Sequence, residues 1–284
     1  MTEFPVTLCT PDEEKSCFAC CPPIRPPGYE HSHYTNEIKR VLRENTASLR
    51  KDEKSVSAIT GFSCWALGYL DGGFKRVGCL LHPSQNDGKD LRYRVNYGDK
   101  CARESCVEAG IFLLLAPETI TFWLRLSHGL DSFSYSSRTV NPLFRILGWG
   151  APVLNLVAMA EKERDLRADS ILELYSFFKT ALSPRANAYL LRVLIDSETL
   201  DLLKNPLFMG RFEEFSIRLS KEVSLQVLSS SGAPYVHSLP MERDFLDFLR
   251  LSGRVLKASE EEAASLKEFT DHELDKFRDE FRLF

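Results

Sequence analysis

Cysteine is absent from the last 178 residues of this 284-residue chain, because all eight cysteines lie between Cys9 and Cys106. Thiols that served general packing would be spread along the chain, so this distribution indicates one localised site. An excess of basic charge is also lacking: the formal net charge is −4, and up to Cys106 there are 15 Lys and Arg against 14 Asp and Glu. We therefore expect no nucleic-acid partner, since no basic surface is available to follow phosphates.

Long apolar runs are missing as well. The most apolar stretch, residues 146–160, is interrupted by two glycines, a proline and an asparagine, so it is too short to span a membrane and is expected in the core. The N-terminus has no basic segment followed by an apolar run and does not resemble a secretory signal. We therefore expect a cytoplasmic protein without a membrane partner, whose cysteines ligate metal rather than form disulfides.

Common catalytic motifs do not occur in the sequence. There is no Walker A loop, no dinucleotide fingerprint and no HExxH helix. Ser127, His128 and Asp131 are close in sequence, but no nucleophile-elbow motif surrounds them, so their proximity is treated as accidental. Nucleotide and protease chemistry therefore lose support, and no catalytic residue is predicted.

The N-terminal part combines loops, turns and one helix. Residues 1–33 are rich in proline and cysteine, and Pro22-Pro23 prevents regular structure, so this loop needs an external clamp. Apolar residues at helical spacing predict an amphipathic helix near residues 34–50. Residues 58–106 alternate Gly-containing turns with short apolar pieces, which predicts short strands and loops folded around metal.

A change in character after Cys106 predicts two parts. Residues 1–106 are expected to form a Cys-rich metal-binding module with the inserted helix, and residues 107–284 an α-helical domain. An apolar share of 44% supports a real core. The predicted fold class is therefore mainly α, with a small irregular Cys-rich module of short strands and loops packed on an α-helical domain.

Helical periodicity continues to the end of the chain. One periodic segment stops at Pro184. Further helices are predicted near residues 118–131, 142–160, 185–204, 207–229, 240–257 and 259–283. Ser259 and Glu262 have the spacing of a capping box at the start of the last helix. An apolar stripe from Leu266 to Phe281 follows, which is expected to dock on the helical bundle and would otherwise bind a partner.

The cysteine spacing carries the strongest chemical signal. The predicted metal ligands are Cys9, Cys17, Cys20, Cys21, Cys64, Cys79, Cys101 and Cys106. A C-x2-C spacing lets two thiolates converge on one ion, and soft thiolates select Zn²⁺, Cu(I) or iron–sulfur clusters. Adjacent side chains in extended backbone point to opposite sides, so Cys20-Cys21 favours two metal centres or one polynuclear cluster. Two four-thiolate zinc sites, or an iron–sulfur cluster on four cysteines with a zinc or spare thiols, both stay open.

Some residues near the cysteines have two interpretations. His82, three residues after Cys79, could complete a site of three cysteines and one histidine or support a thiolate, but a turn histidine without a metal role is favoured. Isolated Cys64 fits a small buried hydrophobe as well as a ligand. Phe18 and Trp65 fit either a shield that keeps water from the metal or ordinary core packing.

The order of the cysteine groups resembles that of the YkgJ-type cysteine-cluster proteins, a family of zinc- or iron-chelating domains. Cys17-Phe18-Ala19-Cys20-Cys21 is followed by Cys64, by the Gly78-Cys79 turn and by the closing pair Cys101 and Cys106. The resemblance covers about residues 9–106, and this chain departs from it by the insertion of residues 84–100. It implies a chelating module that holds Zn²⁺ or an iron–sulfur cluster.

A more distant resemblance is to flagellin lysine methylases, which have a similar cysteine block. It implies an iron–sulfur-containing methyl transferase, although no residue pattern in this chain carries that activity. Two functions are therefore considered. The first is a metal-binding protein whose helical domain recognises a protein partner. The alternative is an iron–sulfur-dependent enzyme or redox protein, for example with methyltransferase-like activity on an unknown substrate, whose site lies between the cysteine module and the helices.

Overall fold

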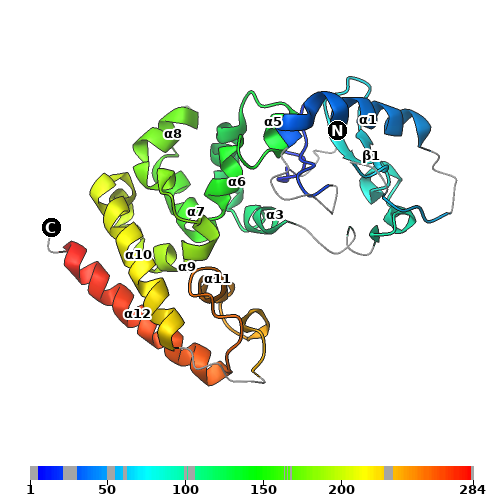
Figure 1. Cartoon of the computed structure of the whole chain (residues 1–284). Helices are drawn as coiled ribbons and strands as arrows, with labels where there is room; N and C mark the ends of the chain where they lie inside the picture. The colour runs from blue at the N-terminus through cyan, green and yellow to red at the C-terminus, as the bar shows by residue number, and fades with distance from the viewer. Residues whose placement is uncertain are drawn as a thin grey trace. The chain divides into compact units, whose positions relative to one another are not determined.

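The fold of the chain was analysed in a computed structural model. The model describes residues 6–21, 31–49, 55–59, 63–98, 101, 106–162, 164, 166, 168–226 and 233–282. These residues are mainly helical and include one two-stranded sheet (Figure 1). The mainly α fold class is therefore confirmed. In this described part of the chain, no helix is both long and apolar enough to cross a membrane.

The chain divides into two compact units. The first comprises Met1–Leu114 and Leu124–Phe144, and the second Leu115–Trp123 and Arg145–Phe284. The expected boundary at Cys106 does not coincide with this division, because residues 107–114 and 124–144 belong to the cysteine-bearing unit. The physical reason is that a helix within residues 124–144 hydrogen-bonds to the cysteine-containing N-terminal loop.

The first unit is built on a short hairpin. Strands β1 (Leu67–Tyr69) and β2 (Val77–Cys79) pair antiparallel, with Leu67 opposite Cys79. The carboxylate of Asp71 accepts hydrogen bonds from three backbone N–H groups in the connecting turn, the shortest 2.6 Å long. The Asp71 carboxylate takes the place of the strand-to-strand hydrogen bonds that the turn cannot make. Strands of three residues are therefore sufficient for this hairpin.

Helix α1 (Thr35–Ser48) packs on strand β1 (Figure 1), which confirms the helix predicted near residues 34–50. Its buried face carries Ile38 and Leu42. The amide of Asn45 donates to the backbone carbonyls of Cys64 (3.1 Å) and Leu67 (2.8 Å). The helix therefore fixes the turn that holds one of the predicted ligands.

The other helices that the structure describes within the first unit are short. They are the α-helices α3 (Val107–Phe112) and α5 (Ser132–Ser136) and the 3₁₀ helices His31–Tyr34, Pro83–Gln85, Arg92–Arg94 and Arg125–Ser127. Phe18 and Phe133 meet edge to face in the hydrophobic core, with ring centroids 5.2 Å apart. This contact joins the N-terminal loop to α5 in one core.

Longer helices make up the second unit. They are α7 (Ala151–Ala160), α8 (Ala168–Leu174), α9 (Pro184–Leu194), α10 (Pro206–Gln226), α11 (Arg243–Leu251) and α12 (Glu260–Arg282), with 3₁₀ helices at Ser176–Lys179, Leu200–Lys204 and Val236–Ser238. Helices α4 (Pro117–Leu124) and α6 (Pro142–Leu147) cross the division between the units. Trp149 and Phe177 are both fully buried, with ring centroids 5.0 Å apart.

Several predicted helices are shorter than their periodicity indicated. The segment 142–160 is split into α6 and α7 because Gly150 adopts a φ of 89°, a left-handed conformation that glycine accepts readily. The segment 240–257 contains only the nine residues of α11, and Arg254 beyond it has a φ of 55°. In segment 185–204, α9 ends at Leu194 and a separate 3₁₀ helix follows. Apolar spacing alone does not mark these backbone breaks.

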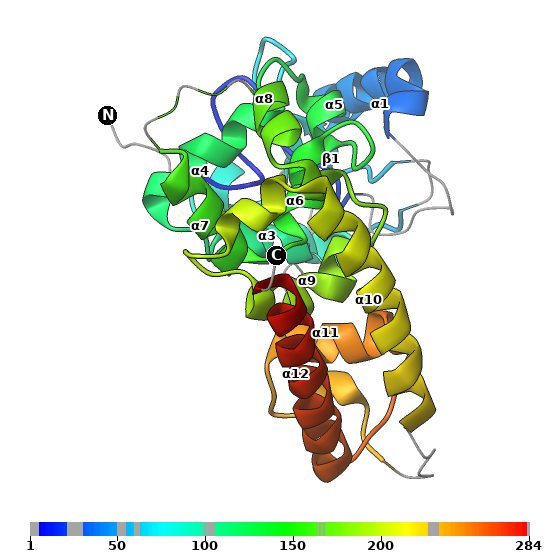
Figure 2. The same ribbon diagram turned by 90° about the vertical axis from the view of Figure 1, so that its left-hand side faces the viewer.

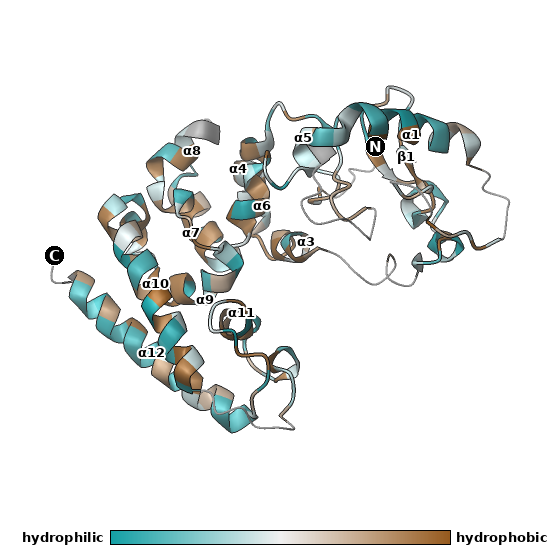
Figure 3. Cartoon of the chain, in the orientation of Figure 1, coloured by the Kyte–Doolittle hydropathy of each residue, from teal (hydrophilic) through white to brown (hydrophobic). Residues whose placement is uncertain are grey.

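The last helix docks within the second unit, as expected. Helices α10 and α12 lie side by side in both views (Figures 1 and 2), and the rings of Phe215 and Phe277 stack with centroids 4.4 Å apart. Apolar and polar residues alternate along α12 (Figure 3), and Leu274 on its apolar side is fully buried. The predicted capping box is confirmed, because Glu262 N–H donates to Ser259 Oγ (3.1 Å) and Ser259 N–H donates to the Glu262 carboxylate (2.8 Å).

Candidate metal centre

All eight predicted ligands lie in the first unit, and all are among the described residues. No disulfide joins any two of them. Four are in the N-terminal loop, one lies in the turn before β1, one ends β2, and the last two flank the residues that lead into α3. The fold thus gathers thiols from about a hundred residues of sequence into one unit.

Four of these thiols are electrostatic neighbours, which we call the first thiol group. It consists of Cys9, Cys17, Cys20 and Cys106. Burial raises the pKa of Cys17 well above its usual range, and the other three thiolates raise this pKa further. Cys9 is exposed at the residue level, yet the protein atoms around it desolvate its thiol, and with the charges of Cys20 and Cys106 this raises the pKa of Cys9 to about 11.

The other four form a second thiol group. It consists of Cys21, Cys64, Cys79 and Cys101. Burial raises the pKa of Cys79 to about 11, with contributions from the thiolates of Cys64 and Cys101. Burial also raises the pKa of Cys64, and the charge of Cys101 adds to it. Cys64 belongs to the hydrophobic core of the unit, and Cys21 and Cys79 pack against that core.

The two groups meet at Cys20 and Cys21, whose Sγ atoms are 4.0 Å apart. The contact with Cys20 raises the pKa of Cys21, as do burial and the charges of Cys79 and Cys64. The expectation that adjacent side chains point to opposite sides is wrong at this position. The backbone is not extended here: Cys21 N–H donates to the Phe18 carbonyl (2.9 Å), and this turn brings the two sulfurs together.

Backbone donors are directed at two thiols of the first group. Ala19 N–H donates to Cys17 Sγ (3.4 Å), and Ala109 N–H donates to Cys106 Sγ (3.3 Å). Each of these bonds lowers the pKa of its thiol against the larger opposite effect of burial. A hydrogen bond to a sulfur favours its charged form, and the thiolate is the form that binds metal.

The second group has the same feature. Backbone N–H groups of Ala66 and Leu67 lower the pKa of Cys64, and that of Leu81 lowers the pKa of Cys79, in both thiols against the larger effect of burial. Two thiols of each group are therefore set up with main-chain donors. Backbone N–H donors of this kind are typical around thiolates that ligate a metal. They offset the free-energy cost of placing several negatively charged sulfurs close together.

One arginine stands beside each group. Arg138 lies close enough to Cys106 to lower its pKa, although burial and the charge of Glu108 each raise that pKa more. The Arg138 guanidinium forms an ion pair with Glu108, whose second contact is 2.9 Å long. Arg92 lowers the pKa of Cys79 against the larger effect of burial; its Nη1 donates to the Cys101 carbonyl (2.8 Å), and its Nη2 donates to the Asp90 carboxylate (2.7 Å). Each arginine therefore stands beside its thiol group as one half of an ion pair with a carboxylate. Sequence reasoning missed them, since no spacing links Arg138 to a cysteine.

Two serines of α5 supply the clamp that the N-terminal loop needs. Ser16 N–H donates to Ser132 Oγ (3.0 Å), and Phe18 N–H donates to Ser136 Oγ (2.9 Å). The Ser16 hydroxyl also donates to the Val77 carbonyl on β2 (2.7 Å). The loop that carries Cys17 is therefore positioned by hydrogen bonds. Phe18 itself is 1% exposed and belongs to the core.

The ambiguous residues resolve in part. His82 Nδ1 accepts a hydrogen bond from Ser84 N–H (3.2 Å) and caps the 3₁₀ helix Pro83–Gln85, which is the favoured role of a turn histidine. Trp65 is partly buried against the core cluster of the first unit. Neither observation gives these side chains a ligand role.

The fit to a metal depends on donor chemistry. Across the described part of the chain, no three Cys, His, Asp or Glu side chains are gathered as a metal site would hold them. The two thiol groups are therefore sets of neighbours and not coordination spheres. Eight reduced thiols in one unit, four of them with thiolate-stabilising N–H donors, match the soft donor set that Zn²⁺ and iron–sulfur clusters require.

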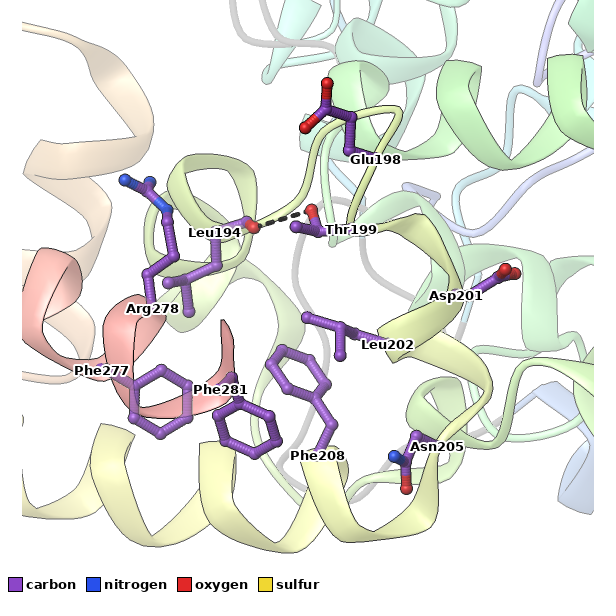
Figure 4. Close-up of a pocket in the computed structure, with 10 residues that line it drawn as sticks. All are labelled: Leu194, Glu198, Thr199, Asp201, Leu202, Asn205, Phe208, Phe277, Arg278 and Phe281. Atoms are coloured by element: carbon purple, nitrogen blue, oxygen red, sulfur yellow. Dashed lines mark hydrogen bonds between the residues drawn. The ribbon is translucent and has the colours of Figure 1, made fainter. Parts of the chain in front are cut away.

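A pocket of about 310 Å³ lies in the second unit (Figure 4). Phe208, Phe277 and Phe281 form its apolar side, and Glu198 and Asp201 lie at its polar rim. The ten described residues that line it include no cysteine or histidine. The pocket thus offers apolar surface without a soft metal ligand, and the thiol groups remain the stronger candidate site.

No family model, no curated protein and no solved structure matches this chain.

Proposed function

We propose that this protein binds metal through its cysteines, with Zn²⁺ as the ion, and that the metal stabilises the first unit while the helical unit recognises a protein partner. The observation that carries the proposal is the collection of all eight thiols in one unit, four of them with backbone N–H donors. The cysteines would hold the ion, which would supply closed thiolate coordination and no open catalytic position.

The build of the first unit supports a structural role for the metal. Its sheet consists of two strands of three residues, and its cysteines lie in loops and at the ends of short elements. Hydrogen bonds from α5 position one loop, but loops of this kind gain most from a cross-link that joins distant segments. A closed zinc site provides that cross-link and couples its binding energy to folding.

The partner role of the helical unit rests on the surface of α10. Helix α10 exposes Ile217 and Leu225 beside the Arg218–Glu222 ion pair. Mixed apolar and charged surface of this kind suits contact with another protein. The metal is the part of the proposal that is tested first.

The test is a metal analysis of the full chain, purified without a chelating tag. Stoichiometric zinc in colourless protein, together with thiols that react only after a chelator is added, is the expected result. His82→Ala is the matched control: it removes a possible zinc donor three residues after Cys79 that has no ligand role in the proposal, so it should keep the full zinc content. A chain that holds no stoichiometric metal would overturn the proposal.

The same measurement addresses the alternative function. A brown protein with stoichiometric iron and sulfide would replace zinc by an iron–sulfur cluster and favour an iron–sulfur-dependent enzyme or redox protein. Colour and sulfide content therefore separate the two functions before any substrate is known.

A further inference from the structure

We propose that the eight cysteines form two separate four-thiolate zinc centres, one on the first thiol group and one on the second, joined through the peptide bond between Cys20 and Cys21. This inference rests on the proposed metal binding and adds to it the number of centres and the ligands of each. Eight thiols divided equally give two closed tetrahedral sites, in which neither ion needs a further ligand.

Helix α5 brings the members of the first thiol group together. The hydroxyl of Tyr135 donates to the Leu8 carbonyl (2.9 Å), next to Cys9, while Ser136 binds the N–H of Phe18, next to Cys17. Cys17 N–H donates to the Cys9 carbonyl (2.8 Å), so these two residues are adjacent across the loop. One helix turn thus positions both.

Cys106, at the far end of the cysteine-bearing segment, is also linked to the α5 region. It caps α3, and Glu108 in the first turn of that helix pairs with Arg138, which follows α5 by two residues. The hydroxyl of Tyr135 lies near enough to Cys17, Cys9 and Cys106 for the charge of each to act on it. Three members of the first thiol group, Cys9, Cys17 and Cys106, therefore lie near the Tyr135 side chain of α5.

The second thiol group is organised by the hairpin instead. Leu67 is the register partner of Cys79 and donates its N–H to the Cys64 carbonyl (3.0 Å), so one residue ties both cysteines to the sheet. The Arg92 guanidinium binds the Cys101 carbonyl, and the neighbouring Leu91 N–H donates to the Leu81 carbonyl (3.1 Å), two residues beyond Cys79. Cys101 is thereby attached to the segment that follows β2.

Cys20 and Cys21 are where the two centres would touch. Sulfurs on one tetrahedral zinc lie roughly 3.8 Å apart, given a Zn–S bond of about 2.3 Å. The observed separation of 4.0 Å fits two sulfurs on one ion or on two neighbouring ions. The surroundings favour two ions, because Cys20 shares with Cys17 the turn that Cys21 N–H closes on the Phe18 carbonyl (2.9 Å), whereas Cys21 packs against the core to which Cys64 belongs and against which Cys79 also packs.

Native mass spectrometry of the full chain tests the number of centres and their ligands. Wild type should carry two zinc ions. Cys106→Ser should lose one and keep one, Cys79→Ser should do the same, and the double variant should carry none. Ser84→Ala is the control and should keep both ions. A wild type with one ion, with iron and sulfide, or with both ions lost in a single folded variant would overturn the two-centre proposal.

A second experiment on wild type keeps the test decisive when variants do not fold. Zinc is removed stepwise with a chelator, exposed thiols are alkylated, and the labelled cysteines are mapped by peptide mass spectrometry. In molecules that retain one zinc, the labels should fall together on one thiol group and spare the other. Labels spread over both groups in those molecules would overturn the proposal. No bound metal at the start would instead overturn metal binding itself, so the two failures are distinct.

Discussion

The backbone N–H of Phe18 donates a hydrogen bond to the hydroxyl of Ser136, 2.9 Å away and 118 residues further along the chain. Both residues are 1% exposed, so no water replaces either partner. This bond positions the loop of Cys17, and it makes α5 part of the candidate site.

Replacement of Ser136 by Ala should therefore destabilise the first unit. The buried N–H of Phe18 would lose its acceptor, which costs about 1–3 kcal/mol. We expect a lower unfolding midpoint and faster alkylation of Cys17. Ser134→Ala, on a less buried position of α5, is the control and should leave both quantities unchanged. Equal behaviour of the two variants would show that the clamp is not needed.

Metal removal should act on the first unit selectively. The closed thiolate sites would be lost there, whereas the second unit has its own aromatic core and no cysteine. We expect a chelator to abolish amide-exchange protection in β1 and β2 but to leave protection in α9 to α12. Mass-spectrometric hydrogen exchange measures both in one sample, and uniform loss across the chain would contradict the expectation.

Phe277→Ala should destabilise the second unit strongly. Its ring stacks on Phe215, and the residue is 6% exposed, so truncation leaves a cavity between α10 and α12. Losses of about 3–5 kcal/mol are usual for such a change. Chemical denaturation followed by helical circular dichroism gives the value. The control, Leu256→Ala, removes a side chain that is 61% exposed and should stay within about 0.5 kcal/mol of wild type.

Tyr175→Phe should weaken a buried polar network in the same unit. The Tyr175 hydroxyl donates to Glu161 (2.7 Å), a carboxylate that is 2% exposed and also pairs with Lys204 (3.2 Å). Without the hydroxyl, the buried Glu161 carboxylate loses one hydrogen-bond donor, which lowers the free energy of unfolding by about 1–3 kcal/mol. Thermal unfolding of Tyr175→Phe and of the exposed-site control Tyr93→Phe should differ by several degrees, and identical midpoints would show that the network is dispensable.

Acid should remove a small stabilisation that comes from Glu273. Its hydrogen bond with Lys276 lowers the pKa of this carboxyl, as does Arg218, although burial opposes both. Because the folded pKa is below the unfolded one, the stabilisation is present above pH of about 4.5 and is lost as the pH falls through the folded pKa. Glu273→Gln should be less stable than wild type at pH 7 by up to about 1 kcal/mol, and the gap should close in acid. A gap that is independent of pH would contradict this origin.

Local patterns in the sequence predicted the features that local forces decide. Ser259 and Glu262 cap α12 because each bonds to the other across three residues. The Cys-rich segment was also evident from spacing. The pairing of Cys9 with Cys106, or of Cys79 with Cys101, was not, since it depends on which loops α5 and the hairpin hold. Ser132 and Ser136 show the same limit: nothing near them in sequence indicates that they bind the N-terminal loop.

Each thiol group takes members from both ends of the cysteine-bearing segment, and this has a consequence for biosynthesis. On a ribosome, Cys9 to Cys21 emerge first, but the first thiol group lacks Cys106 and the second lacks Cys101 until the whole cysteine segment has left the exit tunnel. Ser132 and Ser136 follow later still. In the proposed centres, Cys9 would have to wait for Cys106, 97 residues later, and Cys21 for Cys101, 80 residues later. The early thiols would stay reduced and unligated over that time, since closing such long loops is intrinsically slow.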